Sequence, residues 1–282
     1  MKFDQFGNHS RQIMADPFLG GHVQLATQLS QGVSVSHSFS YGNGPHDQQT
    51  ATTYESSINI SGKKTAFGMR VFPPSHFLAR VTRSLGKFFT VNGTLQNAMP
   101  DAAPVNIGVD STFKHSSFSL QLASDMSTAM SMSIHPSPSL AVGASLLQSQ
   151  GQRAGSLAVE SSFGSLPSLE KDTADVMPRV TTTSILTSTR HFVSSTSVNL
   201  SDSFTVCTEL STSLAEKQKP SVSLGYRYRG QASGIEVRGK VAHNTVMSSI
   251  EGCVLPGVVI GGGIAVSLRE RSSRTGISLT VG

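Results

Sequence analysis

Apolar and polar residues alternate along most of this chain, most clearly in its C-terminal third. The segment 221–229 places a valine, a leucine and two tyrosines on one side and Arg227 and Arg229 on the other. Because successive side chains of a β-strand point to opposite faces, this pattern predicts a strand with one apolar face and one aqueous face. The segments 234–243 and 257–269 repeat the pattern. The C-terminal third is therefore predicted to be a series of amphipathic strands joined by short turns.

The same period of two continues, more weakly, toward the N-terminus. From Gly20 onward we count about nineteen such segments, each about nine to eleven residues long, the length that a tilted membrane strand needs. Their predicted spans are 20–29, 32–42, 50–61, 64–72, 76–84, 87–96, 104–114, 117–124, 128–136, 138–148, 154–163, 179–189, 190–201, 203–214, 220–230, 234–243, 245–255, 257–269 and 274–282. The stretch from Gly164 to Pro178 is the one sizeable insertion and is predicted to be a surface loop.

The composition fits a chain that meets both lipid and water. Charged residues make up 14% of the 282 residues and Trp is absent, whereas a soluble surface normally carries more charge. The mean hydropathy is −0.06. No run of about 18 apolar residues occurs, so a conventional helical membrane protein is excluded. Alternate residues of one strand must then face lipid and water, and a closed barrel allows this because it leaves no unpaired backbone edge in hydrocarbon.

The end of the chain carries a compact motif. Arg274, Gly276, Leu279 and Val281 fit the order polar-x-Gly-x-x-apolar-x-apolar, which resembles the sorting signal on the closing strand of mitochondrial outer-membrane β-barrels. An ordinary amphipathic strand can produce the same order by chance. The position at the C-terminus favours the sorting signal.

Before the first predicted strand, the segment from Lys2 to Asp16 places Phe6, Ile13 and Met14 near one face of a short helix. Gly7 interrupts this pattern, so a frayed polar terminus is the alternative. No charged start followed by an apolar core is visible, as a secretory signal would require. The expected organisation is a helical segment inside the pore over residues 1–19 and a transmembrane barrel over residues 20–282.

One stretch carries a family resemblance. The sequence from His135 to Leu147, His-Pro-Ser-Pro-Ser-Leu-Ala-Val-Gly-Ala-Ser-Leu-Leu, resembles a strand pair and its junction in the pore-forming subunit of the translocase of the mitochondrial outer membrane. Segments that begin at Leu29, Ser221 and Gly276 are similar to other strands of that family. The resemblance implies the mitochondrial porin fold: nineteen strands, the first and last of them parallel, and an N-terminal helix in the lumen.

The resemblance also implies a location and a set of partners. The location is the mitochondrial outer membrane, with the barrel in contact with its lipid. The cargo would be nuclear-encoded precursor proteins, which carry basic amphipathic presequences. Receptors and small helical translocase subunits would be the protein partners, and an oligomer is expected.

Two other functions compete with protein import. The voltage-dependent anion channel family shares the fold and nearly this length, and an excess of inward bases over inward acids would suit anionic metabolites. The predicted inward bases are Lys114, Arg227, Arg229, Arg238, Lys240, Arg269 and Arg274. A soluble β-rich adhesion or structural protein would explain the many serines and threonines but not the inward charges beside outward valines. We favour the translocase because the quoted strands resemble it more closely.

A pore for basic presequences should offer separated acidic and apolar contacts that bind weakly. The candidate acids, all predicted to face inward, are Asp110, Glu160, Glu209 and Glu236. The candidate apolar contacts are Phe6, Ile13 and Met14 of the inner helix. The alternative for each acid is an ion pair with a neighbouring base that only solvates the wall.

Other chemistry finds little support in the sequence. The nine histidines lack metal-ligand spacing, and the two cysteines lie far apart with no CxxC pattern, so we expect no metal, disulfide or cofactor. The net charge of +5 comes from dispersed bases, which argues against nucleic-acid binding. No catalytic motif with its companion residues is present, and we expect no enzyme.

Overall fold

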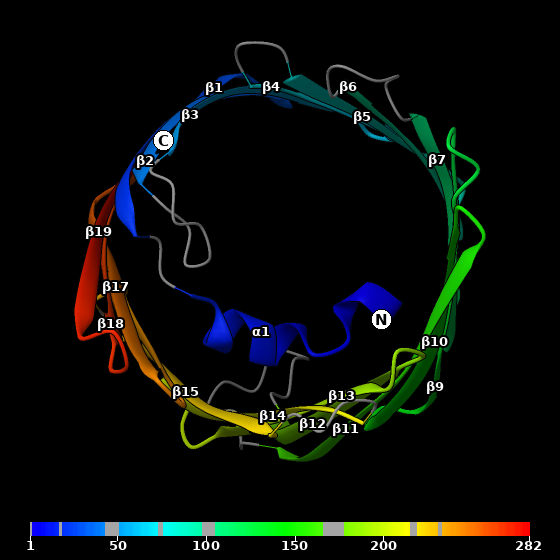
Figure 1. The fold of residues 1–282 in the computed structure, drawn as a ribbon. Helices are drawn as coiled ribbons and strands as arrows, with labels where there is room; N and C mark the ends of the chain where they lie inside the picture. Colours follow the sequence, from blue (N-terminus) through cyan, green and yellow to red (C-terminus); the bar gives the residue numbers. More distant parts are fainter. Residues whose placement is uncertain are drawn as a thin grey trace.

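The computed structural model of the chain describes residues 2–16, 19–42, 51–72, 76–97, 105–165, 178–214, 219–230 and 233–282. These residues form one closed sheet of nineteen strands around an N-terminal helical segment (Figure 1). The strands are β1 Gly20–Ser30, β2 Val33–Gly42, β3 Ala51–Ser61, β4 Thr65–Phe72, β5 His76–Leu85, β6 Phe89–Asn97, β7 Val105–Thr112, β8 Ser116–Ala123, β9 Thr128–Ser137, β10 Leu140–Ser149, β11 Gln152–Ser165, β12 Pro178–Thr187, β13 His191–Asn199, β14 Phe204–Ser213, β15 Ser221–Arg229, β16 Ile235–Ala242, β17 Thr245–Leu255, β18 Val258–Ser267 and β19 Ser272–Val281.

Each strand pairs antiparallel with the next along the chain, and β1 and β19 close the sheet in parallel. The closing register runs from Gly20 opposite Gly276 to Leu25 opposite Val281. The predicted barrel with parallel first and last strands is therefore confirmed. The predicted spans agree with the strands to within two residues at each end. Most of the predicted loop in the 164–178 insertion lies outside the described residues.

Short turns with characteristic residues explain why the predicted strand boundaries lie so close to the observed ones. Gly151 and Gly257 both have φ of +79°, a left-handed conformation that favours glycine. At Gly257 a Cβ would also collide with the backbone carbonyl of Gly282. Two-residue connections such as 150–151 and 256–257 keep neighbouring strands antiparallel with little loop between them.

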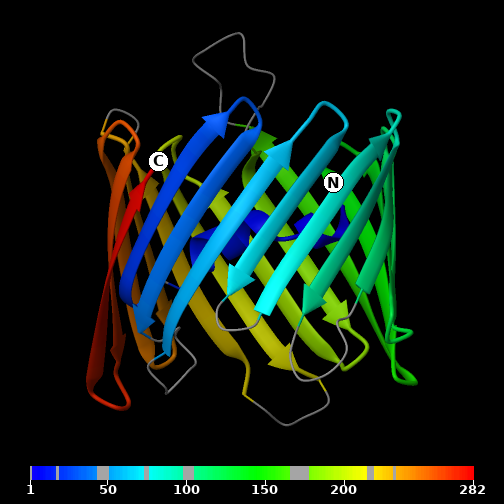
Figure 2. The ribbon, with the colours of Figure 1, turned by 90° about the horizontal axis from the view of Figure 1, so that it is seen from above.

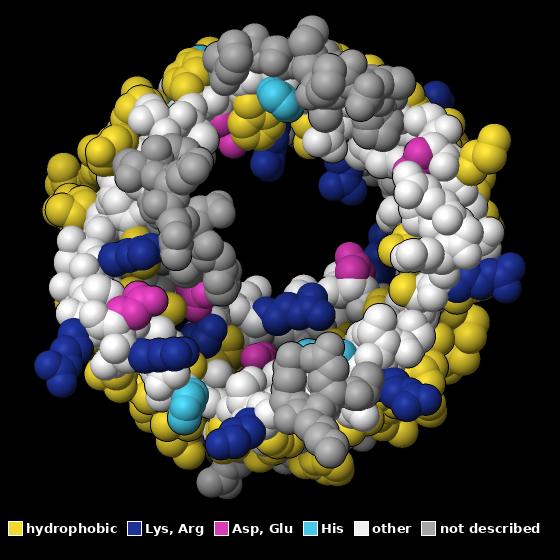
Figure 3. Space-filling model, viewed as in Figure 1, with side chains coloured by type: hydrophobic (Ala, Val, Ile, Leu, Met, Phe, Trp, Pro, Cys, Tyr) yellow, Lys and Arg dark blue, Asp and Glu magenta, His cyan; other side chains and the backbone are white. Residues whose placement is uncertain are grey.

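The two faces of the sheet differ as the alternation predicts. On the outside, Val222 is 60% exposed and Leu224 48% exposed, and apolar residues form the outer rim in Figure 3. On the inside, Arg227 and Arg238 lie directly opposite each other across β15 and β16. Figure 2 shows the strands strongly tilted, with the helical segment at mid-height in the lumen. In the described part of the chain, no helix has both the length and the apolar character needed to cross a membrane.

A charged residue should be tolerated on the lumenal face of a strand and not on its outer, lipid-facing side. We predict that Val81→Lys, on the outer face near the middle of β5, lowers the free energy of unfolding by about 2 to 4 kcal/mol. Thr82→Lys, the next residue and directed into the lumen, should cost much less. Urea unfolding in lipid vesicles measures both values. Equal losses for the two variants would contradict the assigned faces.

Candidate functional site

The N-terminal segment lies inside the barrel, along the wall made by β9 to β16 (Figure 1). It consists of a 3-10 helix at Phe3–Gln5 and the helix α1 at Asn8–Met14. The first contacts β9 and β10, and α1 contacts β13 to β16. Gly7 joins the two pieces with φ of +69°. The single helix predicted over this segment is therefore divided, because the left-handed glycine interrupts it.

Apolar side chains hold the first piece to the wall. Phe6 is fully buried against Ala141 and Ala158, with Phe3 and Ile185 packed beside them. The wall has small residues at these inward positions, and they leave room for the two phenylalanine rings. Burying one phenylalanine side chain contributes about 1.5 to 3 kcal/mol, so this contact is a main source of docking energy.

A second apolar contact holds α1. Ile13 and Met14 are 1% and 6% exposed and pack on Cys207, which is itself fully buried. Gly225 lies directly opposite Cys207 on the neighbouring strand, and a Cβ at Gly225 would approach Met14 Sδ to 2.8 Å and Ile13 Cγ2 to 3.3 Å. Phe6, Ile13 and Met14, the predicted apolar contacts, therefore face the wall rather than the lumen. Their use by a transported peptide stays a prediction that requires the segment to move.

Polar contacts hold the segment at three points. Lys2 Nζ lies 2.9 Å from Asp110 Oδ2, and Lys240 Nζ lies 2.9 Å from Asp16 Oδ1. Between them, the backbone N–H of Gly7 donates to Glu160 Oε2 at 3.0 Å. The two ion pairs are partly exposed to the aqueous lumen, so each contributes at most about 1 kcal/mol. These ion pairs determine where the segment lies on the wall more than how tightly it binds there.

Two of the four candidate acids are paired with bases. Asp110 pairs with Lys2, as described. Glu236 pairs with Arg229 at 2.7 Å and with Arg238 at 3.4 Å. From the sequence, each acid could either form an ion pair with a neighbouring base or contact a peptide. In the structure, Asp110 and Glu236 form ion pairs.

The other two acids have no cationic partner in the described part of the chain. Glu160 accepts hydrogen bonds from Gly7 and from the Thr183 hydroxyl, both at Oε2. The side chain of Glu209 forms neither an ion pair nor a hydrogen bond with any other described residue. The four acids lie on β7, β11, β14 and β16 and are not brought together into one cluster.

The inner wall also carries bases, some of which the sequence reading missed. Arg80 faces inward from β5 and contributes to the electrostatic environment of Asp110, although it was not among the predicted inward bases. Neither Arg80 nor Arg227 forms an ion pair with a described residue. Lys114 and Arg269, predicted to be inward strand residues, lie in turns instead, because β7 and β18 end two residues before the predicted boundaries.

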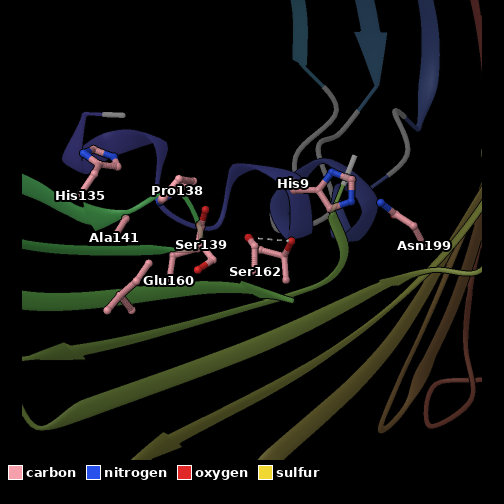
Figure 4. Close-up of a pocket in the computed structure, with 10 residues that line it drawn as sticks. His9, His135, Pro138, Ser139, Ala141, Glu160, Ser162 and Asn199 are labelled. Carbon is pink, nitrogen blue, oxygen red and sulfur yellow. Dashed lines mark hydrogen bonds between the residues drawn. The ribbon is translucent and has the colours of Figure 1, made fainter. Parts of the chain in front are cut away.

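A pocket of about 420 Å³ lies between the N-terminal segment and the wall (Figure 4). His9 of α1 and His135 of β9 line it from its two sides, and Glu160 lies between them. The Nε2 atoms of both histidines are buried and have no hydrogen-bond partner among the described residues. Burial, and then the charge of Arg227, lower the pKa of His9 below its ordinary value, which keeps this imidazole neutral at pH 7.

The lumen stays open beside the segment. Figure 3 shows an opening through the centre, with lysine, arginine and acidic side chains directed into it. An apolar exterior, a closed wall and an open polar lumen define a membrane-spanning β-barrel channel.

The match to a protein family agrees with this class. The eukaryotic porin family matches residues 1–252, so the chain belongs to that family. A comparison with curated proteins gives no match. Among solved structures, the chain is similar to a "CymD monoaromatic hydrocarbon channel" at 12% identity and a TM-score of 0.27, over 93% of this chain and 87% of the other. At this TM-score the likeness carries no argument about this chain.

The docking of α1 can be tested through a natural cysteine. Gly225→Val should push Ile13 and Met14 off the wall and expose Cys207 to a water-soluble maleimide. Cys253 is replaced by serine in all variants, so that Cys207 is the labelled residue. We expect Cys207 in Gly225→Val to be labelled about tenfold faster than with Gly225 retained, which corresponds to a loss of about 1.4 kcal/mol of docking free energy. Gly93→Val is the control, because a Cβ there meets no atom within 4 Å. Unchanged labelling in Gly225→Val would contradict the docked position.

Proposed function

We propose that this channel conducts precursor proteins across the mitochondrial outer membrane. The observation that carries the proposal is the state of the lumen. The segment lies along the wall instead of across the opening, and most inward charges are paired with each other (Figures 1 and 3). A long polymer of changing sequence needs such a wall, because strong binding at any point would stop its passage.

Further support comes from the sequence. The 135–147 stretch resembles the translocase pore, and the terminal motif resembles a mitochondrial sorting signal. Under this proposal the barrel lies in outer-membrane lipid as part of an oligomer, with receptors and small helical subunits as its partners. Glu209 is a candidate presequence contact that needs no rearrangement, since its side chain is inward and forms no ion pair with any described residue.

Passage of anionic metabolites is the second candidate. It is favoured by Arg80 and Arg227, which face the lumen and form no ion pair with any acid in the described part of the chain. Unpaired cationic side chains on the wall would raise the local concentration of anions.

The two candidates can be separated in planar bilayers with the refolded full chain. Under the import proposal, a basic amphipathic presequence peptide blocks the current, and Glu209→Gln lowers the block frequency several-fold because it removes the unpaired acid. Arg227→Gln should change ion selectivity and leave the block intact. The effect of Glu209→Gln should shrink as salt rises from 0.1 to 1 M, since the screening length falls from about 10 to about 3 Å. Absence of peptide block, with ready passage of ATP, would favour the metabolite pore.

The terminal motif makes a separate prediction. Gly276→Glu or Leu279→Asp should prevent assembly in isolated mitochondria, judged by carbonate extraction and native electrophoresis, if Arg274, Gly276, Leu279 and Val281 act as the sorting signal. Because Gly276 also lies opposite Gly20 in the closing register, refolding in detergent is the control for fold damage. Normal assembly, or equal failure in both assays, would contradict a role in sorting.

A further inference from the structure

The pocket between the N-terminal segment and the wall contains an acid that no described residue neutralises. Glu160 is partly buried there and forms no ion pair with any described residue, since Lys2 pairs with Asp110 and Lys240 with Asp16. Both hydrogen bonds that its carboxylate accepts from described residues end on Oε2, so Oε1 remains available to a further donor. A partly buried carboxylate without a cation is costly, and a bound cation would lower that cost.

The two histidines add acceptors to the same pocket. His9 hydrogen-bonds the Asn199 side chain, and its buried Nε2 has no hydrogen-bond partner among the described residues. A neutral imidazole carries a proton on one ring nitrogen and a lone pair on the other, so Nε2 accepts a hydrogen bond in the tautomer that is protonated at Nδ1. The buried Nε2 of His135 is likewise without a partner among the described residues. Glu160 Oε1 and the two Nε2 atoms are therefore three polar positions in the pocket that have no hydrogen-bond partner among the described residues.

The rest of the lining limits the class of ligand. Pro138 and Ala141 give the pocket an apolar side, and Ser162 adds a hydroxyl (Figure 4). Thr181 contributes a second hydroxyl. Within the described part of the chain, no group of three or more His, Cys, Asp or Glu residues is arranged to hold a metal ion. An ammonium or guanidinium group on an alkyl chain matches both features, since it donates several hydrogen bonds and its chain covers apolar surface.

We infer that this pocket binds an alkyl cation, with its charged end at Glu160 between His9 and His135 and its alkyl chain on Pro138 and Ala141. The binding itself follows from the pocket alone. Its use by lysine or arginine side chains of a passing peptide rests on the proposed function. A ligand held there touches both α1 and β9, so its occupancy links the segment to the wall.

The test uses the full chain, labelled with 15N-histidine and refolded in detergent. The probe is n-butylammonium, followed by the imidazole nitrogen signals of the nine histidines, which are assigned with His9→Gln and His135→Gln. We expect saturable shifts of the His9 and His135 Nε2 signals. Glu160→Gln keeps an oxygen for Gly7 and Thr183 and should weaken binding by about tenfold or more.

Matched controls separate the pocket from general charge effects. Glu55→Gln removes an inward acid that pairs with Arg70 on a distant part of the wall, and it should leave binding unchanged. The neutral n-butanol should not shift the two signals. Absence of saturable shifts, equal shifts with n-butanol, or equal weakening by Glu55→Gln would overturn the inference.

A second arm identifies the source of the cation. A lysine-containing amphipathic peptide should compete with n-butylammonium, and the same peptide with acetylated lysines should not. Competition supports a role in peptide transport. Binding of n-butylammonium without competition would assign the pocket to free amines and overturn the transport role, while current block by presequence peptide tests the proposed function independently.

Discussion

Every other feature of this protein depends on the closure of the sheet between β1 and β19. Nineteen strands in an up-and-down order leave the first and last running in the same direction, so only a parallel pair can close the ring. An open edge would leave unpaired backbone groups in hydrocarbon, at a cost of several kcal/mol for each group. Gly20 and Gly276 meet at the start of this pair, where the chain passes from the lumenal segment into the wall. The closed wall then provides the enclosed space that the N-terminal segment occupies.

The segment changes the chemistry of the wall that it covers. Phe6 fills a recess over Ala141, Lys2 neutralises Asp110, and the Gly7 amide occupies one oxygen of Glu160. Each contact removes an apolar or acidic feature from the lumen. What remains open beside the segment is therefore a weakly interacting surface with few unpaired charges. This is a physical reason why the barrel can have a wide lumen without a strong binding site along most of its length.

The sequence predicts the strands well because their signals are local. Alternation and turn residues place the ends of all nineteen strands to within two residues. An error of two residues at the ends of β7 and β18 was enough to assign Lys114 and Arg269 to the wall, whereas both lie in turns.

The candidate site depends on distant pairings that no local pattern encodes. Lys2 meets Asp110 across 108 residues, and Asp16 meets Lys240 across 224 residues. His9 and His135 share a pocket with no spacing in the sequence to indicate it, because one lies on the segment and the other on β9. The alternation of inward and outward residues along β5 could have identified Arg80 as an inward base. Only the folded chain could show that it forms no ion pair with any described acid.

The same contacts restrict how the four candidate acids can act together. With the segment docked, Asp110 is neutralised and Glu160 is partly covered, while Glu236 lies in a network with Arg229 and Arg238. Within the described wall, Glu209 then offers an unpaired carboxylate to the open lumen, and Glu160 keeps one free oxygen in the pocket between the segment and the wall. A basic peptide that used Asp110 or the recess under Phe6 would have to replace the segment, because both make contacts of the same kind, a base on an acid and an apolar side chain on small residues. The wall can therefore present Asp110 and the recess under Phe6 only when the segment leaves it, and the free energy of docking decides how often that happens.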